Sequence, residues 1–124
     1  ERVMTLLHQL GPDKIVITGL REKNDGVAPA TFVNYTFQKD APDPNPTRLA
    51  IPSAGMSRHG TGDIFAAILA ADALLGQKLQ DSVRKASEFI AACIQLSDRL
   101  HIPECEGVCF ENLLDMLLIK EKPQ

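Results

Sequence analysis

The sequence predicts an α/β fold in which helices pack on a mostly parallel sheet with antiparallel additions. Three observations favour this class. A short helical pattern ends at Gly11-Pro12 and is followed at once by a compact apolar run, which is typical of the second half of a β-α-β unit. An alternating segment at residues 31–37 has the pattern of a strand. The second half of the chain then shows helical patterns one after another. This order resembles the back half of an α/β sandwich.

One helix and three strands are expected in the first part of the chain. Apolar residues recur at helical spacing over residues 3–10. Residues 14–18 contain three consecutive apolar side chains, which suits a strand buried on both faces of a parallel sheet. Residues 19–29 are expected to be a polar loop. Residues 31–37 are rich in aromatic and β-branched side chains, and residues 48–51 are expected to be their antiparallel partner.

Three helices are predicted in the rest of the chain. The segment from Asp63 to about Leu75 is almost wholly apolar, which predicts a helix that is buried on most of its faces. A second helix begins near Asp81 and runs to about Leu100. Residues 111–119 are predicted to be a final amphipathic helix. The expected packed side of the second helix consists of Val83, Ala86, Phe89, Ile90, Cys93, Ile94 and Ser97.

Composition argues against several classes of function. A chain of 124 residues suits one domain. Its net charge of −3 and aromatic content of 5% argue against a nucleic-acid partner or an anionic membrane surface. No apolar run approaches the roughly 18 residues of a membrane-spanning helix. Three cysteines do not suggest a disulfide framework, so we expect a cytoplasmic protein.

The sequence Gly60-Thr61-Gly62-Asp63 carries the strongest functional signal. Glycines let the backbone approach a ligand closely. The first N–H groups of the following helix lack intrahelical partners and, with the helix dipole, form an anion site. The carboxylate of Asp63 would repel a phosphate, which suggests a general base that takes a proton from an acceptor hydroxyl. Equally, Asp63 could be a helix N-cap after a tight turn. The pattern is neither a Walker loop nor a dinucleotide fingerprint.

The stretch from Gly60 to Ala67 resembles the C-terminal signature of the ribokinase-like superfamily, and within it the pyridoxal kinases most closely. The sugar-kinase branch usually carries an Asp-Thr pair before the glycines, which this chain lacks. The hydroxymethylpyrimidine kinases often have His-Gly-Thr-Gly-Cys. This chain shares His59 with them but has Asp63 in place of the cysteine, which favours a pyridoxal kinase. The similarity extends from about residue 2 to 118.

The resemblance implies a ribokinase-like three-layer α/β/α sandwich. Residues 1–124 would be its C-terminal, nucleotide-binding part, with the N-terminal half absent. It further implies ATP and Mg²⁺, with the metal held by phosphate oxygens and upstream acids, so no metal ligand is assigned here. A homodimer is expected for the full-length protein. Because most of the vitamin pocket would lie in the absent half, we expect no turnover from this chain alone.

The resemblance also implies roles for individual residues. Asp63 would be the catalytic base that deprotonates the 5′-hydroxymethyl group of pyridoxal, pyridoxine or pyridoxamine. Residues 51–56 and 87–91 would flank the adenine or ribose. The anion hole for the transferred phosphoryl group would be formed by Gly60, Thr61 and Gly62, and the ATP phosphates would lie near Thr18 and Gly19.

Two other functions stay open. One is a hydroxymethylpyrimidine kinase of thiamine synthesis. The other is a module without catalysis that binds a nucleotide or self-associates and that retained the glycine loop. A rate loss on removal of the Asp63 carboxylate would distinguish a kinase from such a module.

Several polar residues have competing interpretations. His101, Cys105 and Cys109 are spaced by four, as zinc ligands on a helix can be, but Pro103 and Gly107 interrupt any helix there. Solvated or half-buried thiols are therefore expected. His59 could touch a phosphate or face solvent. Arg58 is expected to be exposed, and a solvated helix face is expected from Lys78, Arg84 and Lys85.

Overall fold

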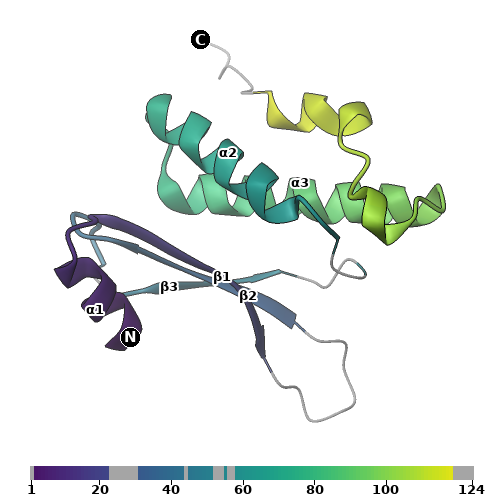
Figure 1. Ribbon diagram of the computed structural model, residues 1–124. Helices are drawn as coiled ribbons and strands as arrows, with labels where there is room; N and C mark the ends of the chain where they lie inside the picture. Colours follow the sequence, from purple (N-terminus) through teal and green to yellow (C-terminus); the bar gives the residue numbers. More distant parts are fainter. Residues whose placement is uncertain (1, 23–30, 44, 52–54, 56–57, 119–124) are drawn as a thin grey trace.

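The structure is a computed structural model that describes residues 2–22, 31–43, 45–51, 55 and 58–118. Figure 1 shows a small sheet with a pair of long helices on one side of it and a short helix on the other. Among the described residues, no helix is long and apolar enough to cross a bilayer. The elements, in order, are α1 (Arg2–Gln9), β1 (Lys14–Glu22), β2 (Thr31–Gln38), β3 (Thr47–Ile51), α2 (Thr61–Leu74), α3 (Leu79–Arg99) and the 3₁₀ helices η1 (Glu104–Glu106) and η2 (Glu111–Leu117).

Within the described residues the sheet has three strands in the order β1-β2-β3, and both pairings are antiparallel. The predicted hairpin between residues 31–37 and 48–51 is therefore confirmed. No parallel pairing occurs among the described strands, and β1 is an edge strand there. Residues 19–22 were expected to begin a loop, but they continue β1 because Leu20, Arg21 and Glu22 pair with the start of β2. The rest of that expected loop, residues 23–29, lies outside the described residues.

Helices cover both faces of the sheet. Successive strand residues point to opposite faces, and the neighbours Val33 and Asn34 are both buried. On the face of Val33, the Phe37 ring lies 5.2 Å from the His8 ring of α1, measured between centroids. On the other face, Asn34 donates a hydrogen bond to Ser87 of α3. The described residues thus form three layers, with α1 on one side of the sheet and α2 and α3 on the other (Figure 1).

The main hydrophobic core lies between α2 and α3. Its buried members are Ile68 of α2 and Ala86, Phe89 and Cys93 of α3. The prediction for the packed side of α3 is confirmed, since that face supplies most of the buried core. Burial of α2 on most of its faces is a wrong prediction. Within this fully described helix Ile68 and Asp72 are buried, because α3 is its main neighbour.

The final predicted helix is a 3₁₀ helix and not an α-helix. Its turns close through bonds between residues three apart, from the N–H of Leu113 to the carbonyl of Phe110 and from the N–H of Leu118 to that of Asp115. Such tighter turns are common in short connecting pieces. The segment still packs as an amphipathic element, because Leu113 and Leu117 contact the α2–α3 core.

Candidate functional site

A β-bulge gives the middle of β1 an unusual shape. The pairing of β1 with β2 shifts between Ile17 and Leu20, so that Thr18 and Gly19 lie opposite the single residue Asn34. Gly19 has a φ of 72°, which glycine adopts without steric strain. Its N–H donates to Asn34 Oδ1 at 3.3 Å. The bulge therefore turns Thr18 and Gly19 out of the regular ladder at one fixed place.

That bulge borders a pocket of about 220 Å³ between the sheet and the α2–α3 pair. Its walls come from segments far apart in the sequence. The apolar part is formed largely by the sheet and by α3, and the beginning of α2 closes one side. The lining residues are Thr18, Gly19, Phe32, Asn34, Ile51, Gly55, Thr61, Gly62, Phe65, Ser87, Ile90, Ala91 and Ile94.

The glycine loop supplies the N-terminus of α2 to this pocket. Gly60 caps the helix with a φ of 80°, and the cap makes no side-chain hydrogen bond. A Cβ atom added at Gly60 or at Gly62 would meet no other atom within 4 Å, so the space above the loop is open. The first N–H groups of the helix point outward without intrahelical partners. The arrangement therefore offers backbone donors and a positive helix end to an anion.

Four of the six residues assigned to the site line the pocket itself: Thr18, Gly19, Thr61 and Gly62. Gly60 lies one residue before this wall. Asp63 is exposed, and as the third residue of α2 it is not the N-cap, because Gly60 holds that position. The alternative reading of Asp63 as an N-cap is thus wrong. The Thr61 hydroxyl is already engaged, since it donates to the Arg58 carbonyl at 3.1 Å.

Residues expected near the base or ribose of a nucleotide also reach the pocket. Ile51 and Gly55 from the first expected segment line it, as do Ser87, Ile90 and Ala91 from the second. The remaining members of the 51–56 segment lie outside the residues that the structure describes. Sequence reasoning missed Asn34, whose amide joins the bulge to α3 through a 3.0 Å bond to Ser87 Oγ. Its signal was a single amide within an otherwise apolar and β-branched strand.

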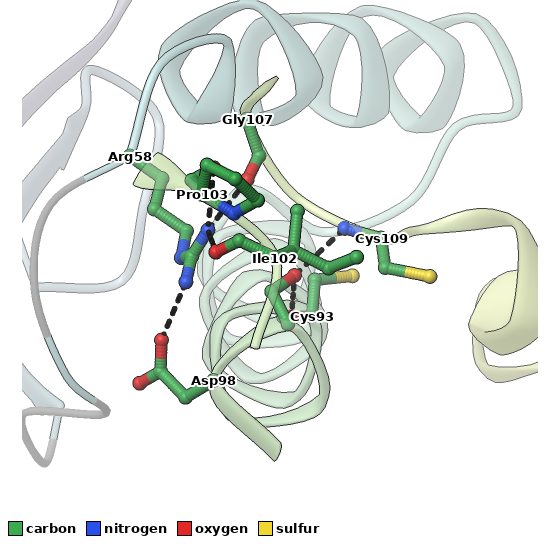
Figure 2. A network of polar contacts seen from close by, with 8 residues as sticks. Arg58, Cys93, Asp98, Ile102, Pro103, Gly107 and Cys109 are labelled. Carbon is green, nitrogen blue, oxygen red and sulfur yellow. Dashed lines mark hydrogen bonds and ion pairs between the residues drawn. The ribbon is translucent and has the colours of Figure 1, made fainter. Parts of the chain in front are cut away.

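Arg58 is buried, which corrects the expectation that it is exposed. Its guanidinium donates to the carbonyls of Ile102 at 2.9 Å and Gly107 at 3.0 Å, and to Asp98 Oδ1 at 2.7 Å. Figure 2 shows this side chain among the carbonyls that follow α3. Burial of Arg58 is possible because several carbonyls and one carboxylate replace the water molecules that the guanidinium loses. His59, in contrast, is exposed.

The remaining polar groups do not form a metal centre. Among the described residues, no three His, Cys, Asp or Glu side chains are grouped so that they could hold an ion. Cys105 is exposed, Cys109 is half-buried and Cys93 is buried, each as expected. Burial raises the pKa of the Cys93 thiol to about 11. Lys85 is not on a solvated face, because it pairs with the buried carboxylate of Asp72 at 2.6 Å.

Comparisons with known proteins bear on the family and the fold of the chain. The sequence profile of the phosphomethylpyrimidine kinase family matches residues 1–108. A solved structure, described as a "putative phosphomethylpyrimidine kinase" from Bacteroides thetaiotaomicron VPI-5482, superposes with a TM-score of 0.81 at 20% sequence identity. The similarity covers 98% of this chain and 40% of that one. No curated protein sequence matches the chain significantly.

These comparisons settle the fold and the family to different extents. The structural neighbour confirms the expected fold, that of part of a ribokinase-like α/β/α sandwich. The chain spans about 40% of the length of that neighbour, so an activity of a whole protein does not follow from it. The family profile covers most of the chain, and its name corresponds to the alternative of a hydroxymethylpyrimidine kinase; it does not confirm the pyridoxal kinase specificity that the sequence favoured. The chain belongs to the phosphomethylpyrimidine kinase family.

Proposed function

We propose that the chain is the C-terminal, nucleotide-binding part of a longer kinase that transfers a phosphoryl group from ATP to a pyrimidine substrate. One observation carries this proposal. The bulge at Thr18 and Gly19 and the N-terminus of α2 at Thr61 and Gly62 border the same pocket. An anion site at one end of a largely apolar pocket suits a nucleotide, which has a phosphate tail and a flat ring system.

Different residues around the pocket would bind different parts of ATP. Backbone N–H groups at the start of α2 would hold phosphate oxygens and stabilise the charge that develops during transfer. The apolar side chains of Phe32, Ile90 and Ile94 would contact the adenine. Asp63, exposed beside the loop, would accept the proton of the acceptor hydroxyl. This division matches the roles that the resemblance implies.

The described residues fit the phosphates but not a resident metal. They include no cluster of acidic or imidazole side chains that could hold Mg²⁺. Mg²⁺ is often bound through substrate phosphates and one or two carboxylates. We therefore assign it no ligand here, and we derive no catalytic step from it. When bound, it would neutralise phosphate charge.

The family supports a pyrimidine as the acceptor. A B6 vitamer is the second candidate, and one observation favours it: Asp63 stands where the resemblance places a cysteine in the hydroxymethylpyrimidine kinases. Both acceptors are nitrogen heterocycles with a hydroxymethyl group. Because most of the acceptor pocket would lie outside this chain, the pocket described here does not discriminate between them.

A kinetic comparison tests the acceptor. The longer protein that carries the chain would be assayed for ADP release with ATP and either hydroxymethylpyrimidine or pyridoxal. We expect the higher kcat/KM with the pyrimidine. A higher value with pyridoxal would reverse the order of the two candidates, and turnover with neither would contradict the kinase proposal.

A binding experiment tests the site without the longer protein. ATP would be titrated into the 124-residue chain while amide resonances are followed by NMR. We expect shifts at Gly19, Thr61 and Gly62, and no ADP release when an acceptor is added. Unchanged resonances at all three positions would argue against this pocket as the nucleotide site. Normal turnover by the chain alone would show that catalysis does not need the N-terminal half that we expect in the longer protein.

A further inference from the structure

Arg58 connects the loop before α2 to the segment that follows α3. Its side chain is 4% exposed. An arginine is seldom buried unless other polar groups pair with it, so its partners matter. Its Nη1 atom lies within hydrogen-bonding distance of the carbonyl oxygens of Ile102, Pro103 and Gly107, at 2.9, 3.3 and 3.0 Å. Nη2 donates to Asp98 Oδ1 at 2.7 Å. Figure 2 shows the guanidinium between Asp98 on one side and these carbonyls on the other.

The same loop touches the C-terminal segment at a second point. Gly107 has a φ of 81°, and a Cβ atom placed there would lie 3.2 Å from the His59 carbonyl oxygen. The backbone of Arg58 also acts on the helix, since its carbonyl accepts the bond from the Thr61 hydroxyl. One residue thus holds the C-terminal segment with its side chain and the first residue of α2 with its backbone.

Asp98 extends this connection to the rim of the pocket. A Cβ atom at Gly55 would lie 2.6 Å from Asp98 Oδ2, so the backbone of Gly55 is pressed against that carboxylate. Gly55 itself lines the 220 Å³ pocket. The Arg58–Asp98 pair therefore contacts the loop both at the pocket rim and directly before the α2 N-terminus.

We propose that Arg58 is a positioning residue that fixes the anion-binding loop at residues 60–63, and that the segment at residues 102–107 is the anchor. The proposal rests on the proposed function. Backbone donors stabilise charge effectively when they are already oriented before the ligand arrives. Carbonyl oxygens and Asp98 already engage both terminal nitrogens of Arg58, so we assign the side chain no direct contact with a phosphate.

The pattern of bonds fits positioning better than stabilisation alone. Arg58 Nε is buried and has no hydrogen-bond partner among the described residues. An arrangement selected for stability alone would gain by pairing that donor or by replacing the arginine with an apolar side chain. An arginine fork instead fixes direction, since its donors lie in one rigid plane.

Pyrophosphate binding to the 124-residue chain tests this proposal. Affinity would be measured for Arg58→Gln, with the Gly60 and Gly62 amide resonances recorded in the anion-free protein. Arg48→Gln is the matched control, because Arg48 also pairs with a carboxylate, that of Glu22, but both of these side chains are exposed. Phe89→Leu controls for lost stability, since it weakens the α2–α3 core without removing any of the hydrogen bonds that Arg58 makes.

We expect Arg58→Gln to weaken pyrophosphate binding about tenfold and to shift both glycine amides. Both controls should bind within about twofold of the original chain and leave those amides in place. Arg58→Lys should recover part of the affinity, because it keeps the charge but not the fork. Where Arg58→Gln does not fold, Arg58→Lys is judged alone, with about threefold weaker binding expected.

The outcomes separate this proposal from the proposed function. Unshifted glycine amides in the Arg58 variants, or affinity equal to that of Arg48→Gln, would overturn the positioning role. If the original chain binds no pyrophosphate, the nucleotide site is contradicted. Arg58 is then judged by the glycine amides of the anion-free protein, where a shift supports the anchor and no shift refutes it.

Discussion

Helices α2 and α3 pack against each other but use their sequences in opposite ways. α2 is almost wholly apolar, yet Leu74 near its end is 91% exposed. α3 is amphipathic and buries Phe89 and Cys93 almost completely. Apolar composition therefore did not decide burial. The number of neighbouring elements did, since α3 lies between α2, the sheet and η2, whereas α2 has one main neighbour among the described elements.

The N-termini of the two helices are similar in sequence but differ in their surroundings. Each carries an exposed aspartate as its third residue, Asp63 in α2 and Asp81 in α3. α2 is capped by Gly60 in a left-handed conformation, whereas α3 is capped by an extended Lys78. The first turn of α2 faces the bulge of β1 across a pocket. A helix N-terminus thus becomes a candidate site through what lies opposite it.

The largest expected effect separates these two aspartates. In the longer protein that carries the chain, Asp63→Asn should lower kcat about a hundredfold to ten-thousandfold, because the acceptor hydroxyl would lose the base that we propose. Asp81→Asn removes an equivalent charge from an equivalent helix position and should leave kcat nearly unchanged. ATP affinity should stay similar in both variants. Equal kcat values for the two would remove the functional distinction between the helix ends.

The next effect concerns the apolar residues of the two helices. Phe89→Ala should lower the free energy of unfolding by about 3–5 kcal/mol, because it leaves a cavity in the core. Leu74→Ala should change it by no more than about 0.5 kcal/mol, since an exposed side chain has little packing to lose. Denaturant unfolding measures both. A loss of several kcal/mol for Leu74→Ala would show that the outer face of α2 is covered in solution.

The polar contact between the helices should have a smaller effect. Asp72 is 3% exposed and pairs with Lys85, and its Oδ2 atom has no partner among the described residues. Lys85→Met would leave a buried carboxylate unpaired and should lower the free energy of unfolding by about 1–3 kcal/mol. The control Lys39→Met breaks the exposed pair with Asp13 and should cost less than about 0.5 kcal/mol. Similar losses in both would mean that the Asp72–Lys85 pair is solvated.

The smallest expected effect is a pH dependence of the stability that arises from Cys93 in α3. Burial raises the pKa of the Cys93 thiol in the folded protein from 9.0 to about 11. The folded state therefore holds this proton more tightly than the unfolded state. The resulting stability is present below pH 9.0 and is lost as the pH rises towards about 11. Thermal unfolding from pH 8 to 11 should show a shallower decline for Cys93→Ala, and identical slopes would exclude this contribution.

Much of the fold followed from local patterns. Residues 3–10, 31–37 and 48–51 formed the predicted elements because helical spacing and strand alternation act over a few residues. The packed side of α3 followed from the same periodicity. The glycine loop was recognised because glycine conformation and helix-end donors are properties of adjacent residues. Thr18 and Gly19 were added to the site by the family resemblance and not by these local properties, and they line the same pocket as Thr61 and Gly62.

The sequence by itself determined where the helices and the hairpin lie and which backbone could hold an anion. Tertiary structure alone decided that Arg58 is buried, that α2 is largely exposed and that Asn34 joins the bulge to α3. It also extended β1 beyond its predicted end through pairing with β2. The reason is physical. Helix and strand patterns report on neighbours in the chain, whereas burial and pocket walls depend on elements that meet only after folding.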